Sequence, residues 1–403
     1  MSLLELSLSE GYVEHWTWKE GIREVIQNAL DCEDFEIKFK PSASQGYKDM
    51  RIITADGAIP RTALLMGESG KRDSSKIGKF GEGLKLALLI LAREGYHVEI
   101  TSGKELWIPE ISESEIFQGV RTLKIEILEN PQGDKDLVEV AINGLPDEYV
   151  DYLRGTYLLD SDINDRLVAE YDGSHALEPE YVDSVDEDGY EIEDAKLCKV
   201  FCGGLYVCDL PDGYDYSYNI APGRLTLDRD RKTVQTWDLQ YEVVRLLTGA
   251  GKTELLVKLA NKNAKDIHGY SQASVTGGVG YGSRAVKFKE EVTELAVDSF
   301  KKRYGEKAVP FTNDTDQVKV KMAIRAGYTP VFVTSAEYQM IDNKISLPSG
   351  LVEVKRPDVL EELTNWVCKY GDIEGSAEII DLVTRLEEYA VFMGLQKSEG
   401  DNE

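Results

Sequence analysis

Cysteine and histidine are both scarce in this chain of 403 residues, which has five cysteines and four histidines. The cysteines are odd in number and scattered, so they give no disulfide framework, and the series Cys198, Cys202 and Cys208 has no histidine near it in sequence. We therefore expect small buried thiols at these positions and no metal site. The chain also lacks a signal peptide and any apolar run of about 18 residues. We expect a soluble, cytoplasmic protein with no membrane partner.

Basic residues are also scarce. The chain has 46 Lys and Arg and 73 Asp and Glu, which gives a net charge of −27. Such a surface repels nucleic-acid phosphates overall, which disfavours direct DNA binding unless basic residues cluster. Part of the acidic excess lies in residues 178–194, where nine of seventeen residues are acidic and none is basic. We expect a solvated loop there. A surface that mimics nucleic acid is the alternative.

Two short motifs near the N-terminus have the residue types of a nucleotide site. Residues 24–31 read EVIQNALD, and on a helix Glu24, Asn28 and Asp31 fall within about 60° of one another. Residues 77–85 read IGKFGEGLK; their glycines let backbone N–H groups approach phosphate oxygens, and a helix follows whose positive end would face the anion. Together the motifs predict a Mg-nucleotide site. The alternatives are an amphipathic surface helix and a flexible turn before a core helix.

The first motif matches position by position the N-box, E-x-x-x-N-A-x-D, of the GHKL superfamily. The chain thus resembles the ATP-binding fold shared by DNA gyrase, the large heat-shock chaperone, histidine kinases and MutL. The resemblance implies that Glu24 is the general base that polarises the attacking water and that Asn28 ligates Mg2+. It also implies that Asp31 orients the helix or a more distant water.

The resemblance extends to two further boxes. The glycine box G-x-x-G-x-G is intact, and the phosphate-binding residues that it implies are Gly78, Lys79, Gly81, Gly83, Leu84 and Lys85. In the box D-x-G-x-G an aspartate accepts a hydrogen bond from the adenine amino group. Asp56 matches that aspartate, but Ala58 and Pro60 stand where the two glycines are expected. The backbone on the adenine side therefore departs from the pattern of the superfamily.

Three other segments are given roles by the resemblance. Residues 67–79, polar and glycine-containing, are similar to the lid that closes over ATP. Thr101, at the end of a strand-like run, would complete the adenine pocket, or else form a turn. Arg224 lies in a stretch that resembles a heat-shock chaperone loop whose arginine reaches the γ-phosphate. Arg229 and Arg231 rank behind it, and the alternative is that these charges pair with neighbouring aspartates on a surface turn.

The patterning predicts an α+β protein. The resemblance implies that a GHKL (Bergerat) sandwich comes first, followed by a transducer-like β-containing domain and a mostly helical α/β domain. The expected strands of the first domain are 36–40, 50–54, 98–101, 122–128 and 137–142. The expected divisions are an ATP-binding domain (1–145), a helix and acidic connection (146–196), the second domain (197–270), a glycine-rich linker (271–284), a C-terminal effector domain (285–396) and a tail (397–403).

We expect a Mg-dependent ATPase that uses ATP and ADP as a conformational switch, as a homodimer clamp acting on an unidentified macromolecule. Residues 3–8, which partly alternate, would add as a strand to a neighbour's sheet, or else pack on their own domain. Histidine kinase activity is the weakest option, because none of the four histidines has a phosphoacceptor setting. The alternative function is a regulatory or host-directed inhibitor that binds nucleotide without hydrolysing it.

Overall fold

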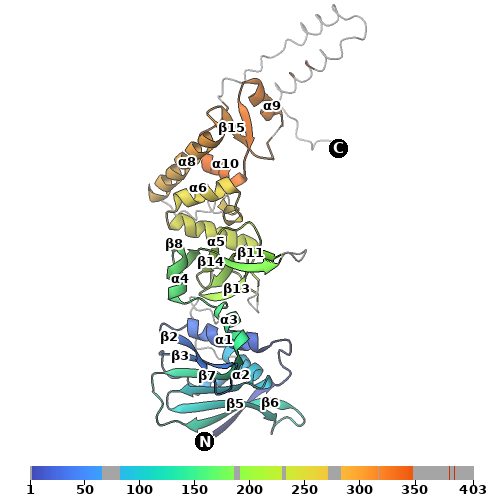
Figure 1. Cartoon of the computed structure of the whole chain (residues 1–403), viewed down its shortest axis with the longest axis vertical. Coiled ribbons are helices and arrows are strands. Elements are labelled where there is room, and N and C mark those ends of the chain that lie inside the picture. The colour runs from blue at the N-terminus through green and yellow to red at the C-terminus, as the bar shows by residue number, and fades with distance from the viewer. Residues whose placement is uncertain are drawn as a thin grey trace, which may run out of the picture. The chain divides into compact units, whose positions relative to one another are not determined.

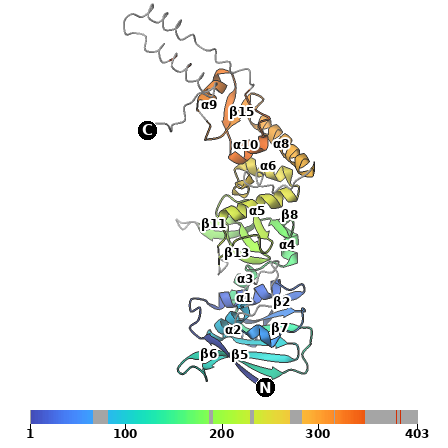
Figure 2. The ribbon, with the colours of Figure 1, turned by 180° about the vertical axis from the view of Figure 1, so that it is seen from behind.

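The computed structural model describes residues 2–65, 82–185, 191–228, 233–270, 283–315 and 317–347, together with residues 381 and 385. The chain forms two compact units (Figures 1 and 2). The first unit comprises residues 1–252 and 264–279, and the second comprises residues 253–263 and 280–403. The protein is mixed α+β, as expected. No helix in the described ranges is long and apolar enough to cross a membrane.

The first unit begins with a seven-stranded antiparallel sheet in the order β1-β6-β5-β4-β7-β3-β2. Its strands are β1 (Ser2–Ser9), β2 (Phe35–Pro41), β3 (Tyr47–Thr54), β4 (His97–Ser102), β5 (Glu105–Glu113), β6 (Arg121–Glu129) and β7 (Val138–Pro146). All five strands expected from the sequence are present. β1 pairs with β6 of its own sheet, with Ser2 opposite Ile127 and Glu5 opposite Lys124. The N-terminal segment thus packs on its own domain.

Two helices, α1 (Trp18–Leu30) and α2 (Gly83–Arg93), pack against this sheet and against each other (Figure 1). Thr17 and Glu20 form a capping box that starts α1. The apolar residues Ile22, Val25, Ile26 and Ala29 of α1 are buried, in the same hydrophobic core as strand residues such as Met50 and Ile100. The motif residues Glu24, Asn28 and Asp31 project from the opposite side of α1, because of their spacing along the helix.

A second, five-stranded sheet follows in the order β13-β12-β14-β9-β8. The elements of this region are α3 (Asp147–Arg154), α4 (Asp160–Arg166), β8 (Leu167–Tyr171), β9 (Ser174–Leu177), β10 (Glu180–Val185), β11 (Glu191–Leu197), β12 (Lys199–Cys202), β13 (Leu205–Asp209), β14 (Ser217–Ile220), α5 (Thr236–Gly249) and the 3-10 turn η2 (Lys265–Ile267). β8 and β9 come from the stretch expected to be a connection. Edge strand β13 lies beside α1, and the Arg23 guanidinium donates to the Tyr206 carbonyl at 2.9 Å.

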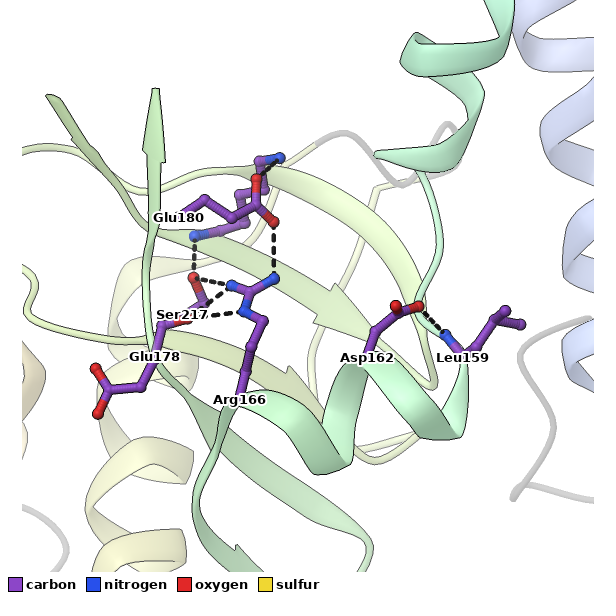
Figure 3. A network of polar contacts seen from close by, with 7 residues as sticks. Leu159, Asp162, Arg166, Glu178, Glu180 and Ser217 are labelled. Atoms are coloured by element: carbon purple, nitrogen blue, oxygen red, sulfur yellow. Dashed lines mark hydrogen bonds and ion pairs between the residues drawn. The ribbon is translucent and has the colours of Figure 1, made fainter. Parts of the chain in front are cut away.

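The acidic stretch is not the loop that its charge suggested. β10 and β11 pair as an antiparallel hairpin, with Glu180 opposite Leu197 and Tyr181 opposite Lys196. Side chains from α4 and β12 hold the base of this hairpin (Figure 3). The Arg166 guanidinium donates to Glu180 Oε1 at 2.8 Å and to the Glu178 carbonyl at 2.7 Å, and Lys199 pairs with the other oxygen of Glu180. These cations offset the negative charge that disfavours order in the isolated sequence.

The second unit contains a βαβ arrangement. Its elements are α6 (Thr253–Lys262), α8 (Ser283–Tyr304), β15 (Ala308–Phe311), α9 (Gln317–Arg325), β16 (Thr329–Phe332) and α10 (Ser335–Ile341). β15 and β16 are parallel, with Val309 opposite Pro330, and α9 lies between them in sequence. The described part of this unit thus combines helices with two short parallel strands. The expected tail at 397–403 and most of the expected linker at 271–284 lie outside the described residues.

Candidate functional site

The first motif forms the polar side of α1. Glu24 is buried with 9% of its surface exposed, and Asn28 and Asp31 are half-buried. Asp31 is the C-cap residue of α1, and its backbone N–H donates to the Gln27 carbonyl at 3.2 Å. The Asn28 carbonyl accepts a hydrogen bond from the Cys32 thiol at 3.3 Å. The carboxylate, carboxamide and second carboxylate therefore follow one another along one side of a well-packed helix.

The Glu24 carboxylate lies against the first residue of α2. A methyl group added at Gly83 would come within 2.2 Å of Glu24 Oε2, so only glycine leaves room for this approach. The carboxylate thus sits at the positive end of α2. Within the described residues, the N-cap residue Glu82 does not cap that helix with its own side chain. The structure brings together Glu24 and Gly83, which belong to two motifs far apart in sequence.

The two helices run in opposite directions. A methyl group at Gly21, in the first turn of α1, would contact Leu91 in the last turn of α2 at 3.2 Å. Glu24 contacts the first residue of α2. Because the helices are antiparallel, the last turn of α1, which contains Asn28, extends past the N-terminus of α2. Gly78, Lys79, Gly81 and the lid expected at 67–79 lie outside the described residues.

Lys85 takes a different position from the expected phosphate contact. Its side chain is fully buried, and the ammonium donates to the carbonyls of Ala63 at 2.9 Å and Leu65 at 2.7 Å. Burial lowers the pKa of Lys85, because it disfavours the charged form. Lys85 follows Gly83 by two positions on α2 and so projects from another side of the helix. The neighbouring Leu84 is partly buried and packs against the core.

Asp56 follows β3 and is exposed. Its main chain is fixed on both sides, since Ala55 N donates to the Asp34 carbonyl at 3.1 Å and Gly57 N donates to the Asp136 carbonyl at 3.2 Å. Gly57 has φ of +90°, which explains the glycine at that position. The structure therefore leaves the Asp56 carboxylate, to which an adenine would bind, open to solvent.

The hydroxyl on the helix side of β4 is Ser102, not Thr101. Residues of β4 alternate between faces, and Val98, Ile100 and Ser102 are buried while Thr101 lies on the other face of the sheet. Thr101 therefore faces away from α1 and α2, and its role in an adenine pocket stays a prediction. Ser102 Oγ accepts from Ile59 N at 2.9 Å and donates to the Ile59 carbonyl at 3.2 Å. The alternation itself could have identified Ser102, since the apolar residues mark the buried face.

The segment after Asp56 has a further contact on β5. It contains the 3-10 turn η1 (Arg61–Leu64). Arg61 donates to Glu105 Oε1 through Nη2 at 2.7 Å and through Nε at 3.0 Å, and Trp107 Nε1 donates to Glu105 Oε2 at 2.8 Å. The hydrogen bond from Arg61 is the main reason why the pKa of Glu105 is lowered. η1 is thereby attached to the end of the sheet that carries Ser102.

Arg224 belongs to an ion-pair network in the second sheet region. Its guanidinium pairs with Asp172, which also pairs with Arg245 at 3.1 Å, and Arg245 Nε donates to Glu242 at 2.7 Å. Asp172 follows β8, at the sheet edge opposite to β13, the strand beside α1. In this structure Arg224 therefore lies at the far edge from α1. Arg229 and Arg231 lie outside the described residues.

The thiols and the carboxylates do not form a metal cluster in the ranges that the structure covers. Cys198 and Cys202 are buried, as expected, whereas Cys208 is only half-buried. Burial raises the pKa of Cys198 to about 11. A Mg2+ ion bound with a nucleotide would not need such a cluster, because it takes one or two protein ligands together with phosphates and water. Asn28 on α1 has a side-chain oxygen of the right kind for that purpose.

Comparison with known proteins gives one weak similarity. A search of family models finds none that matches this chain. A stretch of 142 residues, or 34% of the chain, is 28% identical to an uncharacterized protein of Mycoplasma pneumoniae. The match covers 57% of that protein, so it spans little more than half of its length. The description of this relative names no activity.

Proposed function

We propose that the first region of the chain, residues 1–145, is a GHKL-type domain that binds and hydrolyses ATP with Mg2+. The observation that supports this most is the approach of Glu24 to Gly83. A general base must lie near the phosphates that it serves, and a glycine at the start of a helix is where a phosphate would be received. Two motifs that were recognised separately in the sequence meet at one place.

Each residue has a defined task in this proposal. The Glu24 carboxylate orients and polarises the water that attacks the γ-phosphate. Asn28 holds Mg2+, which neutralises charge on the phosphates when it is bound. Asp56 accepts a hydrogen bond from the adenine amino group, and the start of α2 receives phosphate charge. Asp31 fixes the end of α1, so that Asn28 keeps its place.

We further propose that ATP acts as a switch on a macromolecular partner and promotes a dimer. The second sheet supports this role, because it lies beside α1 and is tied to it by the bond from Arg23 to Tyr206. A shift of α1 on nucleotide binding would therefore reach the second sheet. Sedimentation velocity with and without a non-hydrolysable ATP analogue measures the dimer, and an unchanged monomer in both would remove it from the proposal.

A regulator that binds nucleotide without turnover is the second candidate. Ala58 and Pro60 replace two glycines of the adenine box, and the Lys85 ammonium is committed to main-chain carbonyls. Both features alter how nucleotide would be held while leaving Glu24 in place. The two candidates differ in turnover alone.

A steady-state ATPase assay separates them. We expect Glu24→Gln to lower kcat about 100-fold or more and to leave the Kd for ATP within a few-fold, because the carboxylate positions water and contributes little affinity. Glu36→Gln is the matched control, since Glu36 is an exposed glutamate on the edge strand β2. Binding without turnover in the parent protein would favour the regulator. Equal turnover in the parent and Glu24→Gln would remove Glu24 from the mechanism.

A further inference from the structure

Lys85 is the most deeply buried cation of the described residues, with none of its surface exposed. A buried ammonium is costly unless its donors are used, and here two of its three donors reach carbonyls at 2.9 Å and 2.7 Å. Those carbonyls belong to Ala63 and Leu65, near the end of η1. The Lys85 side chain therefore links α2 to the segment that follows Asp56.

The same segment is held at two other points. Ser102 on β4 both donates to and accepts from the main chain of Ile59, and Glu105 on β5 binds Arg61 through two nitrogens. Leu64 adds a fully buried anchor. Residues 59–65 are thus fixed to α2, β4 and β5 by three separate side chains. These contacts supply order at a place where the sequence lacks the glycines of the superfamily pattern.

Lys85 connects the two halves of the candidate site. It stands two residues after Gly83, which lies against Glu24, and its bonds end in the segment that begins directly after Asp56 and Gly57. We propose that Lys85 is a positioning residue for recognition of the nucleotide base, which acts by holding residues 59–65 in register with Asp56 and does not contact a phosphate. This inference rests on the proposed nucleotide site.

The first test needs no nucleotide. Lys85→Met keeps the length of the side chain and removes both bonds, so we expect amide hydrogen exchange in residues 57–65 to become about tenfold faster. Lys124→Met is the matched control, because Lys124 is also buried and donates to a main-chain carbonyl, that of Glu113, at 2.7 Å. Exchange in residues 57–65 should not change in this control. Unchanged exchange in Lys85→Met would overturn the proposal.

The second test compares ADP with GDP, which have the same phosphates and different bases. Binding is measured by displacement of a fluorescent ADP analogue. We expect Lys85→Met to weaken ADP about tenfold and GDP about twofold, so that the preference for adenine falls about fivefold. If Lys85 were a phosphate ligand, both nucleotides would weaken equally and the preference would stay the same. That outcome, or unchanged affinity for ADP, would overturn the proposal.

A second variant protects the test against misfolding of Lys85→Met. Ser102→Ala removes the hydroxyl that holds Ile59 and keeps Lys85, and we expect it to speed exchange in residues 57–65 and to reduce the preference for ADP in the same direction. If the parent protein binds neither ADP nor GDP, the proposed nucleotide site fails, and the role in base recognition fails with it. The exchange measurement still decides in that case whether Lys85 holds the segment.

Discussion

The two sheets of the first compact unit use their positively charged side chains differently. Around the seven-stranded sheet, three cations bind main-chain carbonyls: Lys85 binds Ala63 and Leu65, Arg93 binds Glu10, Tyr12 and Trp16, and Lys124 binds Glu113. Other cations of this sheet, such as Arg61 and Arg121, pair with carboxylates. Around the five-stranded sheet, cations pair with carboxylates: Arg166 and Lys199 with Glu180, Arg224 and Arg245 with Asp172, and Lys196 with Asp215. At Lys85, Arg93 and Lys124 the acceptor does not titrate, whereas each contact named for the second region has a carboxylate that does.

This difference predicts how the two regions respond to acid. A carbonyl keeps its hydrogen bond from an arginine at any pH at which the fold exists, because arginine stays charged. A carboxylate that is paired in the folded state gives up stability when it must be protonated. The main-chain contacts of Lys85, Arg93 and Lys124 should therefore persist under acid conditions that loosen the second sheet, whereas the contact of Arg61 with Glu105 should weaken as Glu105 is protonated.

The largest effect is expected for Gly83→Ala, which changes the position of the Glu24 carboxylate and leaves its charge in place. In Gly83→Ala the new methyl group would displace the Glu24 carboxylate, which is the end of a flexible side chain and can move at little cost to stability. We expect turnover to fall about 100-fold, because a misplacement of about 1 Å is enough for such a loss. ATPase rates and thermal melts are compared with those of Gly11→Ala, since a methyl group at Gly11 would contact nothing within 4 Å.

Loss of stability without loss of turnover in Gly83→Ala would show that this glycine serves packing. Equal losses in Gly11→Ala would show that the effect is not specific to the contact with Glu24.

The next effect concerns Arg93, which ties residues 10–16 to the end of α2. Its Nη2 donates to the Trp16 carbonyl at 2.6 Å and its Nη1 to the Glu10 carbonyl at 3.1 Å. We expect Arg93→Leu to lower the free energy of unfolding by about 2 kcal/mol, because it leaves these carbonyls without their donor. Urea denaturation should give the same loss at pH 7 and at pH 4.5. A loss that vanishes at the lower pH would break the contrast between the two regions.

The smallest effect concerns Glu180 in the second region. Burial raises the pKa of Glu180, but the hydrogen bond and charge of Lys199 and the charge of Arg166 outweigh burial, so the pKa is lowered overall from 4.5. A carboxylate with a lowered folded pKa contributes stability above its unfolded pKa and loses it as the pH falls through the folded value. We expect Glu180→Gln to cost about 1 kcal/mol at pH 7, and the difference from the parent protein to shrink below about pH 4.5.

Urea denaturation at several pH values measures this difference, with Glu170→Gln as a control at a glutamate on β8 whose side chain is 61% exposed. A constant cost at every pH would show that the charge of Glu180 does not contribute to the fold.

Much of the first region could be predicted because its signals are local. The apolar spacing of residues 22–29 defines the buried face of α1, and alternation defines the strands of the first sheet. The prediction of a loop at residues 178–194 was wrong for a physical reason. The charge of this stretch disfavours order, but it is offset by Arg166 and Lys199, which come from α4 and β12. Sequence spacing does not reveal such partners.

By itself, the sequence determined which residue types lie on one side of α1 and which glycines precede α2, since helical geometry follows from spacing alone. Only the tertiary structure decided that Glu24 meets Gly83, that Ser102 replaces Thr101 on the inner face, and that Lys85 holds Ala63 and Leu65. These outcomes depend on how two helices cross and on which carbonyls a loop presents to them. Both are set by packing between segments that are distant in the chain.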